Sequence, residues 1–177
     1  NHWRREGIAF DALYTGYLAN EGQIDLTKEF IELTRGEGTL IFVDPAMADH
    51  GKFYPAFNDA FAKKMLELVK MADVVCPNIT EACFLLGKHF KNEGEYDEQY
   101  INELVDGFAS LGIKKVVITG VKYGDGRHGA VAYDALSGES RYLYGENHST
   151  SFHGTGDIFS SVLCGAKKNG EDVYSAT

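Results

Sequence analysis

Hydrophobic and polar positions along the chain follow two alternating patterns, which predicts strands separated by helices. Short, largely apolar runs typical of buried strands cover residues 10–16, 39–43, 73–76 and 115–119. Apolar residues at helical spacing occur at 26–33, 57–72, 79–86, 101–111 and 158–166. Strands that alternate with helices form βαβ units, so we expect an α/β fold with a mostly parallel central sheet.

The boundaries of several elements are marked by turn-forming residues. Leu26, Phe30 and Leu33 lie at helical spacing, and we expect them to face the core of a helix that ends before Gly36. Residues 46–54, which follow the second strand, contain no clear period and are expected to form a loop.

The pattern changes after residue 120. Residues 129–136 and 141–144 are strand-like, and the intervening Ser137-Gly138 favours a hairpin turn. We therefore expect an antiparallel hairpin at one edge of the sheet. Ile158 and Val162 then begin the apolar spacing of a final helix.

The composition is that of an ordinary globular domain. The chain has 177 residues, 44% of them hydrophobic, which suits one domain over residues 1–177. Its net charge of -9, without a Lys/Arg cluster, argues against nucleic-acid and membrane partners. No apolar run approaches the ~20 residues that span a bilayer. The three cysteines form no C-x-x-C pair, which favours buried thiols in a reducing, cytoplasmic compartment.

A glycine-rich segment, Gly154-Thr155-Gly156-Asp157, follows His153 and precedes the last predicted helix. Backbone N–H groups at a helix start can bind an anion, and glycines let a ligand come close. Asp157 could then accept a proton from an attacking hydroxyl, as phosphoryl transfer requires. Asp157 could equally be an ordinary first-turn acid of a helix. His153 is interpreted as a local hydrogen-bonding residue.

A second motif, Asn78-Ile79-Thr80-Glu81, follows the third predicted strand. Asn78 as N-cap and Glu81 three residues later form the pattern of a capping box. Glu81 could also lie near a Mg²⁺ ion that bridges phosphates, because Mg²⁺ prefers carboxylates and retained waters. These two interpretations are compatible.

Further polar or small residues follow the predicted strands, where α/β sheets bind ligands. They are Tyr17, Asp44, Asp49, Thr119 and Gly120. Asp44 and Asp49 could support a cation beside a triphosphate or belong to a solvated turn. The chain contains no G-x-x-x-x-G-K-[ST] motif, no histidines at metal-binding spacing and no nucleophile elbow around Ser160.

In their order and spacing these motifs resemble those of the ribokinase superfamily and, within it, the pyridoxal kinases. The resemblance extends over nearly the whole chain, in segments 10–18, 43–54, 72–82, 118–120 and 154–160. It implies a ribokinase-like three-layer sandwich and a homodimer. It also implies that the chain is incomplete, without the first strands of the family fold and without its C-terminal end.

The resemblance implies a role for each motif. Asp157 would be the catalytic base that faces the 5′-hydroxymethyl group of pyridoxal, and Gly154, Thr155 and Gly156 would form the anion hole. Asp49 and Glu81 would act through Mg²⁺, and Tyr17 would approach the pyridine substrate. The residues along the ATP site, beside a possible K⁺ or Na⁺, would be Asp44, Asn78, Glu81, Thr119 and Gly120.

Two other functions stay open. Hydroxymethylpyrimidine (phosphate) kinases resemble the chain around Asp44 and Asn78, but they usually carry Cys where Asp157 stands. A non-catalytic relative that binds nucleotide or pyridoxal phosphate would not need Asp157. Family members usually carry Thr at Cys76, which puts a cation contact of that side chain in doubt.

Overall fold

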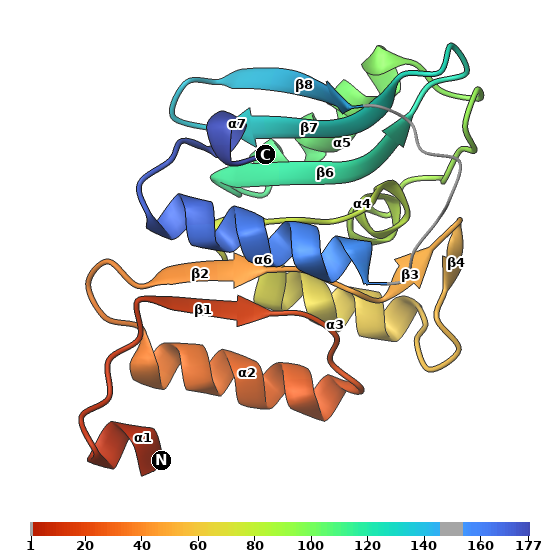
Figure 1. Ribbon diagram of the computed structural model, residues 1–177. Helices are drawn as coiled ribbons and strands as arrows, with labels where there is room; N and C mark the ends of the chain where they lie inside the picture. The colour runs from red at the N-terminus through yellow and green to blue at the C-terminus, as the bar shows by residue number, and fades with distance from the viewer. Residues whose placement is uncertain (1, 146–153) are drawn as a thin grey trace.

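The computed structural model describes residues 2–145 and 154–177 and has a six-stranded mixed sheet at its centre (Figure 1). In spatial order the strands are β1 (Ala12–Thr15), β2 (Leu40–Val43), β5 (Val74–Val75), β6 (Lys115–Lys122), β7 (His128–Asp134) and β8 (Glu139–Gly145). The first four are parallel, and β6, β7 and β8 pair antiparallel. The predicted parallel sheet with an antiparallel edge hairpin is thereby confirmed.

Helices cover both faces of this sheet (Figure 1). One face carries α2 (Glu21–Thr34), α3 (Asp59–Val69), α4 (Ile79–Leu86) and α5 (Glu98–Ser110). The other face carries α6 (Thr155–Lys168) and the short α7 (Val173–Ala176), and α1 (His2–Arg5) lies at the N-terminus. Separate hydrophobic clusters form the two interfaces, which gives the three-layer arrangement.

Strand β2 shows why the central strands are continuously apolar. Ile41 and Val43 belong to the cluster under α2–α5, whereas Phe42 belongs to the cluster under α6. All three side chains are fully buried, as the sequence predicted for a strand covered on both faces. Truncation of Phe42 to alanine would cost about 3–5 kcal/mol.

The apolar positions that indicated two of the helices do not all lie on their buried faces. In α2 the buried residues are Ile24 and Ile31, seven positions apart, and Leu26 is 65% exposed. At ~100° per residue, Leu26 points about 200° away from Ile24, so the helix cannot bury both. In α6 the buried residues are Ser160, Leu163 and Cys164, while Val162 is 63% exposed.

The predicted loop at 46–54 contains a small hairpin of β3 (Ala48–Asp49) and β4 (Lys52–Phe53). Its turn residues, His50 and Gly51, have φ angles of 49° and 73°. Positive φ at both central positions is the geometry of a type I′ turn, whose twist matches that of paired strands. The hairpin projects from the sheet end at which β1 and β2 terminate (Figure 1).

The predicted state of the cysteines is confirmed, because Cys76, Cys83 and Cys164 are free and buried. Among the described residues no helix has the length and apolar character needed to cross a membrane.

Candidate active site

The predicted site residues lie where the parallel strands end. Hydrogen bonds between neighbouring segments continue past the strands: the Asp44 amide donates to the Thr15 carbonyl at 2.9 Å, and the Thr119 amide donates to the Pro77 carbonyl at 2.9 Å. The backbone positions after β1, β2, β5 and within β6 are therefore fixed relative to one another. This is the edge at which open α/β sheets bind ligands.

Four acidic residues from different parts of the chain lie within electrostatic reach of Tyr54 at this edge. Partial burial raises the pKa of its phenol to about 12, and the negative charges of Glu81, Asp49, Asp44 and Asp157 add to the effect in that order. The structure thus gathers the acidic residues that the sequence singled out.

Asp44 is buried, with 7% of its surface exposed, and it fastens α6 to the sheet. Its Oδ2 accepts a hydrogen bond of 2.8 Å from the Ser160 hydroxyl. Burial raises the pKa of Asp44 to about 6; the Ser160 bond opposes that shift, and the charge of Asp157 adds to it. Ser160, which the sequence suggested only as a rejected nucleophile, is therefore the residue that connects the two motifs.

Glu81 forms the predicted capping box. The Glu81 amide donates to Asn78 Oδ1 at 3.0 Å, and Glu81 Oε2 accepts from the Asn78 amide at 2.9 Å. Oε1 accepts a further 3.0 Å bond from the Met47 amide. Burial and the Asp44 charge raise the pKa of Glu81 to about 8, against the lowering effect of these backbone donors.

The first turn of α4 also holds the β3–β4 hairpin in place. Asn78 Nδ2 donates to the Ala48 carbonyl at 2.8 Å, and the Gly51 amide donates to Thr80 Oγ1 at 3.0 Å. These bonds set the position of Asp49, whose exposed carboxylate accepts a 2.8 Å bond from the adjacent His50 amide. No role was assigned to Thr80 from the sequence. Its position between Asn78 and Glu81 in the motif was the one feature of the sequence that could have indicated its contact with the hairpin.

The start of α6 has no comparable side-chain cap. Gly154, its N-cap, has a φ of 84° and makes no side-chain hydrogen bond to the helix. A β-carbon added at Gly154 or Gly156 would meet no described heavy atom within 4 Å. Asp157 lies exposed in the first turn. Backbone N–H groups at a helix start, beside a carboxylate, are suited to an anion that reacts with a hydroxyl group. His153 lies outside the described residues.

Thr119, Gly120 and Tyr17 complete the predicted set. Strand β6 bulges between Ile118 and Val121, and Gly120 there has a φ of 69°. Thr119 forms an isolated parallel bridge with Asn78, which continues the pairing of β5 with β6 beyond the end of β5. Tyr17 is 56% exposed, with its ring centroid 5.3 Å from that of Phe57.

Within the described ranges, no three His, Cys, Asp or Glu side chains are grouped closely enough to hold a metal ion. Glu81 is largely occupied by backbone donors, which leaves Asp49 as the exposed carboxylate nearby. Such a donor set fits Mg²⁺, which keeps several waters and is bound by one or two carboxylates and by substrate phosphates.

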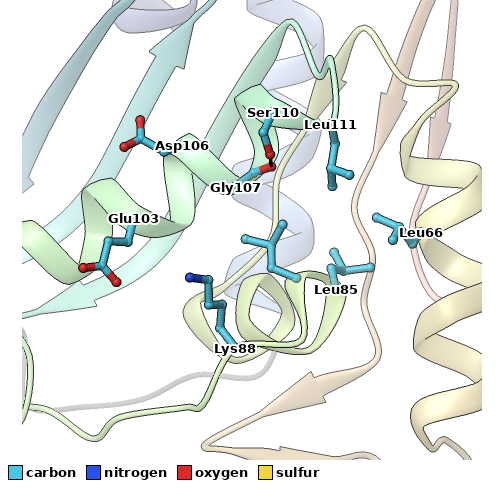
Figure 2. Close-up of a pocket in the computed structure, with 9 residues that line it drawn as sticks. Leu66, Leu85, Lys88, Glu103, Asp106, Gly107, Ser110 and Leu111 are labelled. Atoms are coloured by element: carbon cyan, nitrogen blue, oxygen red, sulfur yellow. Dashed lines mark hydrogen bonds between the residues drawn. The ribbon is translucent and has the colours of Figure 1, made fainter.

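A groove of about 550 Å³ lies elsewhere, between α3, α4 and α5 (Figure 2). Its lining is partly leucine and partly charged: Leu66, Leu85, Leu86, Lys88, Glu103, Asp106, Gly107, Ser110 and Leu111. Since the lining contains none of the four acids and no strand end, this groove is not the candidate active site.

The parallel core of the sheet, its antiparallel hairpin and the helices on both faces are those of a ribokinase-like α/β fold. The chain belongs to the phosphomethylpyrimidine kinase family, whose model matches residues 4–177. Over 162 residues it is 26% identical to a pyridoxal kinase of Dictyostelium discoideum, covering 85% of this chain and 52% of the relative.

Two solved structures extend this likeness. A protein of Bacteroides thetaiotaomicron assigned to the phosphomethylpyrimidine kinases, crystallised with pyridoxal, is 30% identical, with a TM-score of 0.91 over 99% of this chain and 61% of its own. The ADP complex of Bacillus subtilis pyridoxal kinase is 26% identical, with a TM-score of 0.78 over 97% of this chain and 62% of its own. The chain therefore spans roughly half to three fifths of the length of these relatives.

Proposed function

We propose that the protein transfers the γ-phosphoryl group of ATP to the 5′-hydroxymethyl group of pyridoxal. The observation that carries the proposal is the start of α6, where Asp157 stands beside backbone N–H groups that Gly154 does not cap with a side chain. The pyridoxal and ADP complexes of the relatives support the choice of both substrates.

In this proposal Asp157 accepts the proton of the 5′-hydroxyl group while the hydroxyl oxygen bonds to the γ-phosphorus. The bond from that phosphorus to the β–γ bridging oxygen breaks, and ADP leaves. The amides of residues 154–156 stabilise the charge on the transferred group. Asp157 contributes by position as much as by basicity, since the hydroxyl loses its proton late in a loose transition state.

The ATP side of the site comprises Asp44, Asn78, Glu81, Thr119 and Gly120. Asp49 would contact Mg²⁺ directly, and Glu81 would act on it through water, because backbone amides occupy both Glu81 oxygens. The metal would neutralise phosphate charge. Tyr17 offers an exposed ring for the pyridine, and a K⁺ or Na⁺ ion could sit beside Asp44.

The second candidate is hydroxymethylpyrimidine phosphorylation, which is favoured by the family to which the chain belongs. The deciding experiment gives the full-length protein ATP and Mg²⁺ with either pyridoxal or hydroxymethylpyrimidine, and measures ADP and the phosphorylated product. Turnover of pyridoxal at the higher kcat/KM is the expected result. Turnover of hydroxymethylpyrimidine alone would establish the second candidate.

A non-catalytic role would leave both substrates unchanged while ATP or pyridoxal phosphate still binds, as calorimetry would detect. Asp157 argues against that outcome, because binding alone does not require a carboxylate beside an anion site. The homodimer and the cytoplasmic location stay predictions.

A further inference from the structure

The turn of the β3–β4 hairpin lies between two groups that do not belong to the hairpin. On one side the Gly51 amide donates to Thr80 Oγ1 at 3.0 Å. On the other side lies the ring of Phe90, because a β-carbon added at Gly51 would be 2.6 Å from its Cδ1 and 2.9 Å from its Cε1. The ring is therefore in van der Waals contact with the backbone of the turn, and it fits there because residue 51 has no side chain.

Phe90 belongs to a short segment after α4 whose position is fixed by α5. The hydroxyl of Tyr100, a residue of α5 that is only 6% exposed, donates to the His89 carbonyl at 2.6 Å. The same oxygen pairs with Cys83 Sγ at 3.0 Å, and the Lys91 ammonium lies 4.6 Å from the centre of the Tyr100 ring. One buried side chain thus contacts both neighbours of Phe90 in the chain, and through them it sets where the Phe90 ring lies.

The carboxylate of Asp49 depends on the hairpin for its position. Within residues 2–145 and 154–177, its polar contacts are with the adjacent His50, whose amide donates to Oδ1 at 2.8 Å and whose Nε2 lies 3.5 Å from Oδ2. Both contacts move with the hairpin. The direction in which the carboxylate points is therefore set by the contacts that fix the turn, at Thr80 and at Phe90.

We propose that Phe90 is a positioning residue, whose ring, held by Tyr100, fixes the turn at Gly51 and with it the carboxylate of Asp49. The inference rests on the proposed function, in which Asp49 contacts Mg²⁺. Loss of the ring should weaken the Mg²⁺ site, because a metal ligand on a loosened hairpin must be ordered when the ion binds. The base Asp157 belongs to α6, which this contact does not reach, so kcat at saturating Mg²⁺ should change little.

The first test compares Phe90→Ala with Phe10→Ala in the full-length protein. Phe10 is also a partly buried ring, with centroids 5.5 Å from that of Trp3 and 5.6 Å from that of Phe30, and it precedes β1 at the end of the strand away from the site. For Phe90→Ala we expect the Mg²⁺ concentration for half-maximal activity to rise about tenfold, the scale for residues that support a metal ligand.

The other constants separate positioning from a general loss of stability. In Phe90→Ala, kcat at saturating Mg²⁺ and KM for pyridoxal should stay within about twofold of wild type. Phe90→Tyr keeps the ring and should restore the wild-type Mg²⁺ requirement, and Phe10→Ala should not change it. A wild-type Mg²⁺ requirement in Phe90→Ala, or an equal rise in Phe90→Ala and Phe10→Ala, would overturn the inference.

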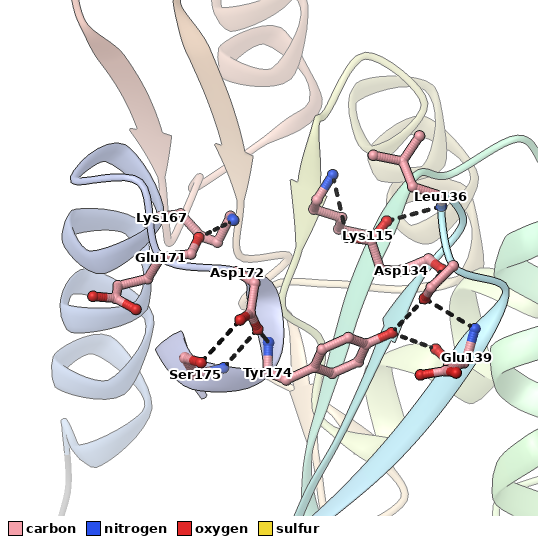
Figure 3. A network of polar contacts seen from close by, with 10 residues as sticks. Lys115, Asp134, Leu136, Glu139, Lys167, Glu171, Asp172, Tyr174 and Ser175 are labelled. Carbon is pink, nitrogen blue, oxygen red and sulfur yellow. Dashed lines mark hydrogen bonds and ion pairs between the residues drawn. The ribbon is translucent and has the colours of Figure 1, made fainter.

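A second pair of variants, Tyr100→Phe and Tyr174→Phe, removes one hydroxyl group each. The Tyr174 hydroxyl donates to the Glu139 carbonyl at 2.9 Å and pairs with Ser137 at 2.8 Å, so it bonds to one carbonyl and one side chain as Tyr100 does (Figure 3). Its partners lie at the turn between β7 and β8, at the end of the sheet opposite the hairpin (Figure 1). We expect Tyr100→Phe to raise the Mg²⁺ requirement about threefold, the scale of one hydrogen bond, and Tyr174→Phe to leave it unchanged. An equal shift in both variants would contradict the inference.

Amide hydrogen exchange in Mg²⁺-free solution separates this inference from the proposed function. If the wild-type protein phosphorylates neither substrate, the proposed function fails, and exchange still tests Phe90. The amides of Gly51 and Tyr54 donate the hydrogen bonds on either side of β4. They should exchange several-fold faster in Phe90→Ala than in wild type or Phe10→Ala. Unchanged exchange at these two amides would show that Phe90 does not hold the turn.

Discussion

Two helices, α4 and α6, begin at the same edge of the sheet and differ in how their first turns are satisfied. Asn78 caps α4, and Glu81 returns a bond to the Asn78 amide, so the helix start is closed by its own side chains and buried. Gly154 offers α6 no side chain, and the residues that follow it are exposed. Both starts carry an acid, Glu81 in one and Asp157 in the other.

We interpret this difference as one between a supporting helix start, that of α4, and a reactive one, that of α6. Backbone N–H groups at a helix start need an acceptor, and an anionic ligand can supply one. At α4 the acceptors come from the chain, and the remaining polar groups of the turn hold the β3–β4 hairpin. We therefore assign α4 the task of placing Asp49 and α6 the task of chemistry.

The largest effect that this comparison predicts is on Asp157. In the full-length enzyme Asp157→Asn should lower kcat by ~10²-fold or more, the scale of a positioned acid–base group. Asp172→Asn is the matched control, since Asp172 begins α7 by accepting from the Tyr174 amide at 2.8 Å, away from the site. Steady-state kinetics with pyridoxal measures both variants. Near-normal turnover of Asp157→Asn would remove the assigned role.

A smaller effect is expected from the glycine that opens α6. Gly154→Ala keeps open space around the new β-carbon but must hold a φ of 84°, which costs about 1 kcal/mol or more. We expect the first turn to shift and kcat to fall about tenfold. Gly87→Ala imposes similar strain at the end of α4, where φ is 64° and the surroundings are also open.

The comparison of these two glycine variants is informative because their strain is alike. Denaturant unfolding should show similar losses of stability, while only Gly154→Ala loses activity. Equal activity in the two variants would mean that the start of α6 has no special part in the reaction.

The sequence predicted those contacts of the site whose two residues lie close together along the chain, and missed those whose residues lie far apart. The capping box was predictable because Asn78 and Glu81 are three residues apart and obey a local rule. The Ser160–Asp44 bond joins residues 116 positions apart, which no local pattern encodes. The buried face of α2 was mispredicted for a related reason: Ile24 and Leu26 are equally apolar, and only packing against the sheet selects Ile24.

The next prediction concerns the task assigned to α4. Asn78→Ala removes the cap and the bond to the Ala48 carbonyl, and should lower the free energy of unfolding by about 1–2 kcal/mol. It should also raise the Mg²⁺ concentration needed for half-maximal activity, because the hairpin that carries Asp49 loses an anchor. Urea unfolding and a Mg²⁺ titration of the full-length protein measure the two effects.

Asn20→Ala provides the control for this variant. Asn20 caps α2 by accepting from the Gln23 amide at 3.0 Å, at the start of a helix that does not anchor the hairpin through this cap. Its loss should reduce stability by a similar amount and leave the Mg²⁺ requirement unchanged. A Mg²⁺ requirement that moves equally in both variants would show that it follows stability and not the position of Asp49.

The last effect expected is a pH dependence of stability that belongs to Glu81. Burial raises its pKa from 4.5 to about 8, so in Mg²⁺-free solution the folded protein retains a proton that the unfolded chain releases. The stabilisation that Glu81 contributes is complete below pH 4.5 and is lost as the pH rises towards 8.

The pKa of Asp44 is raised as well, but only to about 6, so the pH interval from about 6 to about 8 isolates the contribution of Glu81. Glu81→Gln should flatten the curve in that interval. Urea unfolding at several pH values gives the comparison. Parallel curves for the two proteins would mean that Glu81 is already ionised in the folded protein, held by its backbone donors.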